Sequence, residues 1–266
     1  MTNFVALTLG NSTAAAAPVA DGRLGTVVRC SIHDLQELSD LLTPCRTDAA
    51  APVPLVVASV NPPALEALRR LATDLHLVPP RVARNDFLIP FATAVDEPDR
   101  VGVDRLLGAL AAYRQTGGPC LVLDCGTATT LSAVSAEGIF LGGSIFPSPD
   151  LMARALAEGT AQLPHVEVRE IAPVIGKNTE EAIRAGVSLG WTGAVMHMLA
   201  AAMSDLGPQV TVFLTGGGLA LAAPLISDLV RDLADVGGRD PESLCRTAPN
   251  LVLEGLVIAY RESAGR

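Results

Sequence analysis

The sequence predicts an α/β protein whose two halves share one plan and face each other across a cleft. Two stretches support this prediction, VALTLGNSTAAAAPVADGRL at 5–24 and LVLDCGTATTLSAVSAEGIF at 121–140. Each begins with an apolar run, reaches a glycine, continues with small and hydroxyl residues, and turns at an acidic residue followed by glycine. Gly10 and Gly126 are 116 positions apart, and the two turns are separated by the same offset.

A second pair of segments extends the repeat. The stretch LVVASVNPPALEALRRLA at 55–72 has the pattern of a strand, a breaker and a helix, and VTVFLTGGGLALAAPLISDLV at 210–230 has the same order. We therefore predict two α/β domains, at residues 1–116 and 117–266.

The individual elements follow from local patterns. Each repeated stretch is expected to form three strands, because pairs such as Asp21-Gly22 favour hairpin turns. Apolar residues at helical spacing predict a weak helix near 33–42, a helix within 97–114 and a long one at 179–203. Asn178 is expected to cap the long helix in a capping box.

Along the long helix, small residues recur every four positions. Such a stripe lets a second helix approach closely, so it predicts tight helix packing, either within the domain or between two copies of the chain. The stripe consists of Ala182, Gly186, Gly190 and Ala194.

Composition excludes several classes of protein. The formal net charge is −9 and no basic run occurs, so we expect no binding to nucleic acid. No window reaches the roughly 18 apolar residues that a membrane span needs, and the start resembles no signal peptide, so we expect a cytoplasmic protein without membrane contact. The five cysteines form no CxxC pair and are expected to be reduced thiols without a metal site.

The glycine loops are candidates for phosphate binding. Successive backbone N–H groups in tight turns make concave anion sites, and two such loops could hold a triphosphate from both sides. Asp124 ends a buried strand directly before one loop, where a cation that accompanies phosphate would need an oxygen ligand. A simple turn is the alternative for Asp124 and Gly126, and the repeat favours function.

Three further positions have two readings each. Asp104 lies in the first turn of a predicted helix. It could stabilise the helix dipole, or it could act as a base for a substrate hydroxyl. Thr179 begins the long helix and is either structural or a ligand donor. The glycines of LTGGG at 214–218 offer helix N–H groups and a flat backbone surface to a nucleotide, although such turns are common.

Taken in order, the motifs DCGTATT, GIFLGGSIFP, LMARALAEGTAQLP, IGKNTEEAIRAG, FLTGGG and LVLEGLVIAY, with GVDR before them, resemble type III pantothenate kinase. The resemblance covers 98–260 well and 1–15 weakly. It implies two ribonuclease-H-like halves of the actin-like ATPase superfamily. It also implies ATP-dependent phosphorylation of pantothenate to 4′-phosphopantothenate, the first step of coenzyme A biosynthesis, by a homodimer that needs Mg²⁺ and a monovalent cation, K⁺ or NH₄⁺.

The resemblance also assigns roles to residues. Asp104 would be the base that takes the proton of the pantothenate hydroxyl, and Asp124 would hold the monovalent cation. Thr127 would contact ATP phosphate, and Thr179 would touch pantothenate. The remaining residues would line the substrate pocket or form the first phosphate loop. They are Gly102, Val103 and Arg105 for the pocket, and Thr8, Leu9, Gly10, Asn11, Ser12, Thr13, Ala14 and Ala15 for the loop.

The chain departs from the family pattern at four places. Thr8 stands where the family has an aspartate, Val95 replaces a tyrosine, Ser132 replaces an aspartate, and Ser148 follows Pro147 where the family has glycine. Phosphoryl transfer depends on cation placement and charge neutralisation, so the loss of a carboxylate is expected to weaken metal affinity. Two alternatives therefore stay open: a silent homologue that binds ligand and acts as a regulator, and a kinase or phosphatase with another acceptor.

Overall fold

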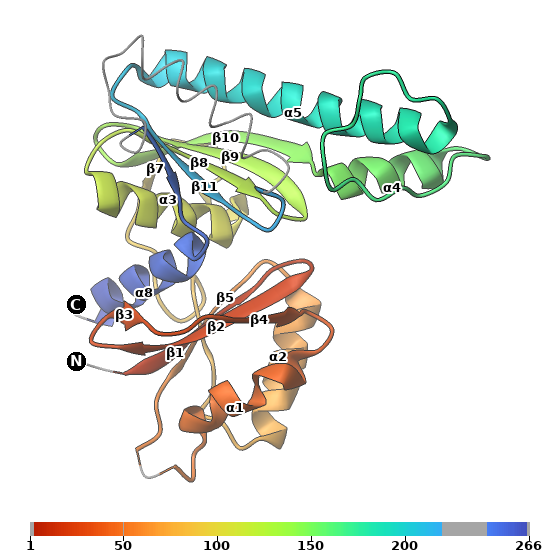
Figure 1. Cartoon of the computed structure of the whole chain (residues 1–266). Coiled ribbons are helices and arrows are strands. Elements are labelled where there is room, and N and C mark those ends of the chain that lie inside the picture. The colour runs from red at the N-terminus through yellow and green to blue at the C-terminus, as the bar shows by residue number, and fades with distance from the viewer. Residues whose placement is uncertain (1–2, 50, 220–243, 265–266) are drawn as a thin grey trace. The chain divides into compact units, whose positions relative to one another are not determined.

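The computed structural model describes residues 3–49, 51–219 and 244–264 (Figure 1). The chain divides into two compact units, one of Met1–Gln115 with Asn250–Arg266 and one of Thr116–Pro249. Each unit contains a mixed sheet with helices packed on it, so the predicted α/β class is confirmed.

The sheet of the first unit has the strand order β3-β2-β1-β5-β6, with β4 also paired to β2. Strand β1 is antiparallel to β2 and parallel to β5. Both central residues of the two-residue turn between β2 and β3 have positive φ, 51° at Asp21 and 76° at Gly22, as a type I′ hairpin requires. The strands are β1 (Phe4–Leu9), β2 (Thr13–Ala20), β3 (Arg23–Leu24), β4 (Val28–Ser31), β5 (Leu55–Ser59) and β6 (Arg81–Val82).

Alternation along β1 sends side chains to both faces of this sheet, and each face carries helices. Val5, Leu7 and Leu9 join a core cluster with α1 (Ser39–Leu42) and α2 (Pro62–Asp74). The weak helix predicted near 33–42 is a 3₁₀ turn, Leu35–Leu38, followed by the single turn of α1.

The opposite face is covered by α8 (Leu251–Ala264), and α3 (Val103–Thr116) joins the same core cluster. Phe4 lies edge-on to Tyr260 of α8, with ring centroids 4.9 Å apart. Gly255 allows α8 to approach the backbone of Leu107 so closely that a Cβ there would collide with it. Salt-bridged Arg114 and Glu262, 3.0 Å apart, join the far ends of the two helices.

The last helix therefore belongs with the first compact unit, although it comes at the end of the chain. The prediction of domains at 1–116 and 117–266 rested on the duplicated strand plan and stays a prediction. The compact units have different bounds from the predicted domains, because the apolar face of α8 is buried in the core that contains Phe4. That face includes Leu253, Leu256 and Val257.

The second unit repeats the arrangement. Its sheet includes the order β12-β11-β8-β9-β10, in which β8 is antiparallel to β9 and parallel to β11. This is the predicted hairpin followed by a parallel strand. The helix predicted after Gly218 lies outside the described residues. The strands are β8 (Cys120–Cys125), β9 (Ala128–Val134), β10 (Ile139–Pro147), β11 (Thr211–Thr215) and β12 (Cys245–Thr247), and a short β7 (Ala92–Thr93) precedes them.

Helices α4 (Pro149–Gly159) and α5 (Thr179–Leu206) belong to the second unit, with α5 running along the sheet and past it beside α4 (Figure 1). Within the described residues, α5 is a helix long and apolar enough to cross a membrane by length and composition. One side of it carries Trp191, Val195 and Leu199, all at most 1% exposed, into the core of this unit. That burial is the behaviour of a core helix.

The predicted cap of α5 is confirmed. The Asn178 side chain accepts a hydrogen bond from the Glu181 N–H at 2.9 Å, and the Glu181 carboxylate accepts one from the Lys177 N–H at 2.7 Å. At α4, Ser148 accepts from the Leu151 N–H at 3.2 Å, so the serine that replaces the family's glycine is a helix cap. The five cysteines are unpaired thiols, as predicted.

Candidate active site

The β1–β2 hairpin of the first unit, predicted to be the first phosphate loop, presents mainly its backbone. Leu9 and Ala14 are buried in the core, so their side chains serve packing. The N–H of Gly10 donates to the Thr13 carbonyl at 2.9 Å and closes the turn. Residues 11–13 between them are exposed, so an anion can reach this segment.

Thr8 occupies the end of β1, where the family pattern has a carboxylate. Its hydroxyl donates to the Ala15 carbonyl at 3.3 Å, across the hairpin. The side chain therefore holds the two strands together and brings no charge to the loop.

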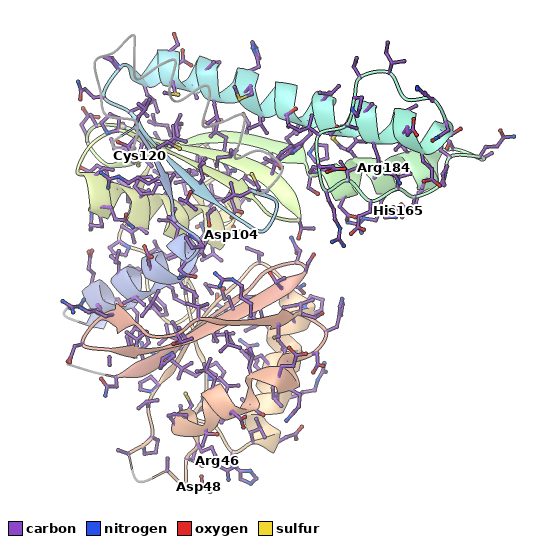
Figure 2. The ribbon with its side chains drawn as sticks, viewed as in Figure 1. Arg46, Asp48, Asp104, Cys120, His165 and Arg184 are labelled. Atoms are coloured by element: carbon purple, nitrogen blue, oxygen red, sulfur yellow. The ribbon has the colours of Figure 1, made fainter. Side chains whose placement is uncertain are left out.

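Asp104 lies in the first turn of α3 (Figure 2), and its carboxylate is tightly framed by backbone. Its Oδ1 accepts a hydrogen bond from the Arg105 N–H at 2.8 Å. A Cβ on Gly102 would be 2.5 Å from the same oxygen, so a larger residue there would displace the carboxylate. Val103, by contrast, is buried in the core cluster of α3 and α8.

Burial dominates the electrostatics of this corner. Burial raises the pKa of Asp104 above its ordinary value, opposed by the Arg105 N–H and by the positive charges of Arg105 and Arg84. Burial also lowers the pKa of Arg105, again opposed by the neighbouring carboxylate. A carboxylate with a raised pKa accepts a proton more readily than a solvated one.

Asp124 ends β8 in the second unit, against the glycine-rich loop that follows β11. Gly216 has φ +94°, and a Cβ on it would be 2.5 Å from Asp124 Oδ1. The Gly218 N–H donates to the Cys125 carbonyl at 2.8 Å. The loop thus packs backbone-first onto the end of β8, beside the carboxylate, at the edge where parallel strands of α/β sheets bind ligands.

The turn between β8 and β9 carries the other predicted phosphate contact. Gly126 is exposed and Thr127 is half-buried. Thr129 is buried and accepts a hydrogen bond from the Trp191 indole N–H at 2.9 Å, so it anchors α5 to the sheet. Ser132, where the family has an aspartate, is 1% exposed.

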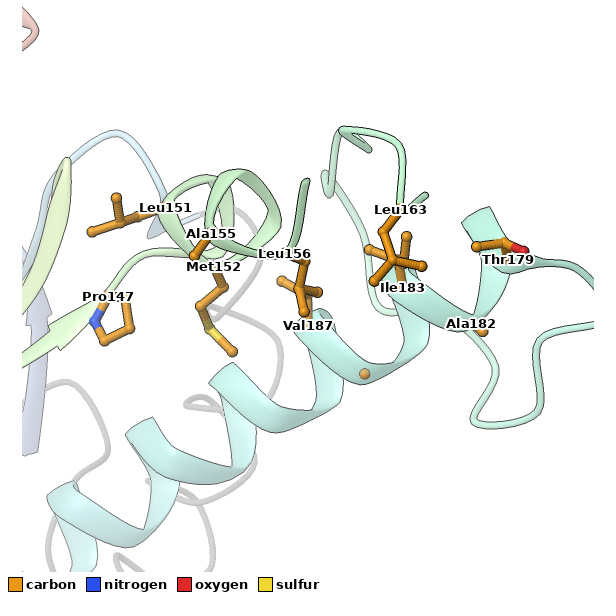
Figure 3. Close-up of a pocket in the computed structure, with 11 residues that line it drawn as sticks. Pro147, Leu151, Met152, Ala155, Leu156, Leu163, Thr179, Ala182, Ile183 and Val187 are labelled. Atoms are coloured by element: carbon orange, nitrogen blue, oxygen red, sulfur yellow. The ribbon is translucent and has the colours of Figure 1, made fainter. Parts of the chain in front are cut away.

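Thr179 lines a pocket of about 650 Å³ between α4 and α5. Figure 3 shows it at one end of a row of apolar side chains that includes Met152, Leu156 and Ile183. The walls are almost wholly apolar, so Thr179 supplies the hydroxyl of this pocket. Gly186 also lines it, and neither Gly186 nor Gly190 has a neighbour within 4 Å of a Cβ position, so this part of the stripe is not packed against a helix of the described chain.

The structure brings some predicted residues together and separates others. Gly102, Asp104 and Arg105 form one corner at the start of α3. Asp124 and the 216–218 loop form a second corner at the ends of β8 and β11, whereas Thr179 belongs to the α4–α5 pocket. Among the described residues, no group of three His, Cys, Asp or Glu side chains is placed to hold a metal ion.

Sequence reasoning missed two features. The glycines of LTGGG suggested a nucleotide surface, but their packing beneath Asp124 depends on the β8–β11 pairing. Arg84, whose charge acts on Asp104, gave no signal in the sequence, because a lone arginine in a loop has no telling spacing.

A hairpin, a parallel strand and covering helices, present in both units, define an actin-like α/β fold. Solved structures agree. The Lmo2764 protein from Listeria monocytogenes matches with TM-score 0.52 and 16% identity, covering 99% of this chain and 100% of that one. The ethanolamine utilization protein EutJ from Carboxydothermus hydrogenoformans matches with TM-score 0.50 and 13% identity, covering 97% and 90%.

Sequence comparison then gives the family. The model of the family "Type III pantothenate kinase" matches residues 4–201. The type III pantothenate kinase of Acidiphilium cryptum is 38% identical over 79% of this chain and 73% of its own length. That of Koribacter versatilis is 31% identical over 82% and 80%. The chain belongs to the type III pantothenate kinase family, and the predicted resemblance is confirmed.

Proposed function

We propose that the protein transfers the γ-phosphoryl group of ATP to the terminal hydroxyl of pantothenate, giving 4′-phosphopantothenate and ADP in the first step of coenzyme A biosynthesis. Family membership supports the reaction. The observation that carries it is the half-buried Asp104 carboxylate at the start of α3, which lies beside Gly102 and accepts a hydrogen bond from the Arg105 N–H.

In the proposed step, Asp104 accepts the proton of the pantothenate hydroxyl. The oxygen then forms a bond to the γ-phosphorus while the bond from that phosphorus to the β–γ bridging oxygen breaks, and ADP leaves. The raised pKa of Asp104 favours this proton transfer. Arg105, adjacent to the base, suits the carboxylate of pantothenate.

The phosphates of ATP are proposed to bind the exposed turn of the β1–β2 hairpin and Thr127. Mg²⁺ is proposed to arrive with the nucleotide, because Mg²⁺ in such sites is bound largely by substrate phosphate oxygens. ATP and its metal supply the leaving phosphate and the charge neutralisation that this chemistry requires.

Asp124 is the proposed ligand of a monovalent cation, K⁺ or NH₄⁺. The carboxylate fits such an ion by its chemistry, because it is a charged oxygen ligand, and Gly216, lacking a Cβ, lets the loop approach Oδ1 without a side chain between them. A single carboxylate with carbonyls is a weaker, less charged site than a divalent cation demands.

We also propose that the protein is a cytoplasmic homodimer that binds neither nucleic acid nor membrane. The exposed part of the small-residue stripe on α5 and the exposed apolar residues of the second unit support self-association. Ile145 is 68% exposed and Ile175 is 81% exposed. Analytical ultracentrifugation of the full chain is expected to give twice the chain mass of 27.5 kDa, and a monomer at micromolar concentration would contradict it.

The reaction is tested by coupled ADP release with pantothenate, Mg-ATP and K⁺ or NH₄⁺. Wild type is expected to turn over only with pantothenate present. Asp104→Asn is expected to lower kcat by about 10²–10⁴-fold, with the KM for ATP changed less than about twofold. No pantothenate-dependent turnover by folded wild type under either cation would refute the proposal, and calorimetric ligand binding without turnover would identify a silent homologue instead.

A further inference from the structure

Arg84 occupies a backbone conformation that favours glycine. Its φ is +72°, in a turn closed by a 2.8 Å hydrogen bond from its own N–H to the Phe87 carbonyl. The Asp86 side chain also accepts a 2.7 Å hydrogen bond from the Val82 N–H, so the turn is fixed from both ends. A non-glycine residue in this region costs about 1–2 kcal/mol. A large side chain kept at a strained position points to a use for that side chain.

The guanidinium of Arg84 binds three backbone carbonyls of one short segment. It donates to the carbonyl oxygens of Pro98 at 3.0 Å, Asp99 at 3.2 Å and Val101 at 2.6 Å. Pro98 and Asp99 belong to the 3₁₀ turn Pro98–Arg100. The planar, multiply donating guanidinium fits such a set of acceptors, whereas a lysine ammonium does not.

That segment runs directly into the corner that holds Asp104. Gly102 follows Val101, and a methyl group on Gly102 would lie 2.5 Å from Asp104 Oδ1 and displace it. The Gly102 carbonyl accepts the first bond of α3, from the Leu106 N–H at 3.3 Å. A shift of the segment would therefore shift both the helix start and the carboxylate on it.

The charges around Asp104 are consistent with this connection. Burial raises its pKa, and the groups that oppose the rise are the Arg105 N–H and the charges of Arg105, on the same helix, and Arg84, from the strained turn. Arg84 thus acts on the carboxylate both through the backbone it holds and through its charge.

We propose that Arg84 is a positioning residue for phosphoryl transfer: its guanidinium fixes the 98–101 segment so that Asp104 is presented in one place to the substrate hydroxyl. This inference rests on the proposed function. A misplacement of about 1 Å at a reacting group costs on the order of 10²-fold in rate, which sets the size of the effect.

Four variants test the proposal. Arg84→Met removes the donors and the charge, Arg84→Lys keeps the charge, and Arg84→Gly relieves the strain while removing the side chain. The matched control is Arg100→Met, because Arg100 lies in the same segment but pairs at 3.0 Å with exposed Glu97.

Arg84→Met and Arg84→Gly are expected to lower kcat by about 10–10²-fold, with Arg84→Gly the more thermally stable of the two. The acid limb of the kcat profile is expected to shift to higher pH in both and to stay in place in Arg84→Lys, which recovers only part of kcat. Arg100→Met is expected to match wild type. Wild-type kcat and pH profile in Arg84→Met would overturn the proposal.

Amide hydrogen exchange separates this proposal from the proposed reaction. Exchange in residues 101–106 is expected to be faster in Arg84→Met than in wild type or Arg100→Met, whether or not the protein phosphorylates pantothenate. Unchanged exchange there would overturn the positioning role even in an active kinase. If exchange is faster in Arg84→Met but wild type does not phosphorylate pantothenate, only the proposed reaction is refuted and the positioning role stands.

Discussion

The β1–β2 hairpin of the first unit and the β8–β9 hairpin of the second occupy matching places in their sheets. Thr8 lies opposite Ala15 on the antiparallel strand and Ala58 on the parallel one. Asp124, 116 positions later, lies opposite Thr130 and Thr215 in the same way. The backbone frame is therefore duplicated, but a carboxylate is present at only one of the two strand ends.

The loop after β5 in the first unit and the loop after β11 in the second also differ in how they are closed. After β5, Ser59 and Asn61 close the turn by side chains, and Asn61 caps α2 by accepting from the Ala64 N–H at 3.0 Å. After β11, Gly216 and its neighbours close the turn by backbone contact with the end of β8. The comparison teaches that duplication preserves pairing and register, while charge and space for a ligand are set separately in each half.

Among variants that compare the two hairpins, the one that removes the Asp124 charge should have the largest effect on activity. Asp124→Asn is expected to lower kcat/KM for ATP by about 10²-fold and to abolish stimulation by K⁺ or NH₄⁺, because preorganised charge is lost beside the phosphates. The measurement is coupled ADP release as a function of cation concentration. The matched variant Thr8→Val should change kcat/KM by less than about threefold, and equal effects at both positions would break the asymmetry.

The loops provide the second test. Gly216→Ala places a methyl group 2.5 Å from Asp124 Oδ1 at φ +94°, so it should cost about 1–3 kcal/mol in strain and lower kcat by about tenfold. Thermal unfolding and steady-state kinetics measure both. Ser59→Ala, at the matching place in the first unit, should cost about 1 kcal/mol and leave kcat near wild type. An active, stable Gly216→Ala would show that the close packing serves no function.

Placing a carboxylate at Thr8, the position in the first unit that matches Asp124, should have a smaller effect. Thr8→Asp is expected to lower the KM for Mg-ATP by about threefold to tenfold, because it adds a carboxylate at the first phosphate loop while losing the bond to Ala15. Titration of Mg²⁺ at fixed ATP measures this. Thr8→Asn, similar in shape but uncharged, is the control, and the same gain in Thr8→Asn would exclude charge as the cause.

The smallest expected effect is on stability. Burial raises the native pKa of Asp104 above its unfolded value, so its contribution is most favourable below the unfolded pKa, about 3.9, and is lost as pH rises through the native pKa. Asp104→Asn should therefore raise Tm at pH 7, and the gain should shrink toward pH 4. Glu158→Gln, at an exposed position on α4, should show no such trend. A lower Tm for Asp104→Asn at pH 7 would contradict the burial of the charge.

Much of the fold was predictable because it depends on local pattern. The acidic-glycine turns, the strand–breaker–helix order at 55–72 and the Asn178 cap are properties of neighbouring residues, and these are confirmed, whereas the second helix of that pattern, after Gly218, lies outside the described residues. The packing of α8 on the first sheet was not predictable, because it joins residues at opposite ends of the chain. Nothing near Gly255 in sequence indicates Leu107 as its neighbour.

The candidate site divides in the same way. The sequence by itself determined which chemical groups are available: the carboxylates of Asp104 and Asp124, the glycines beside them, and an uncharged Thr8. Only the tertiary structure decided how those groups are surrounded, because desolvation, the pairing of β11 with β8 and the hold of Arg84 on a distant segment arise from contacts between parts of the chain that are far apart in sequence. Local patterns carry no information about such contacts, whereas the pKa and the position of a reacting carboxylate depend on them.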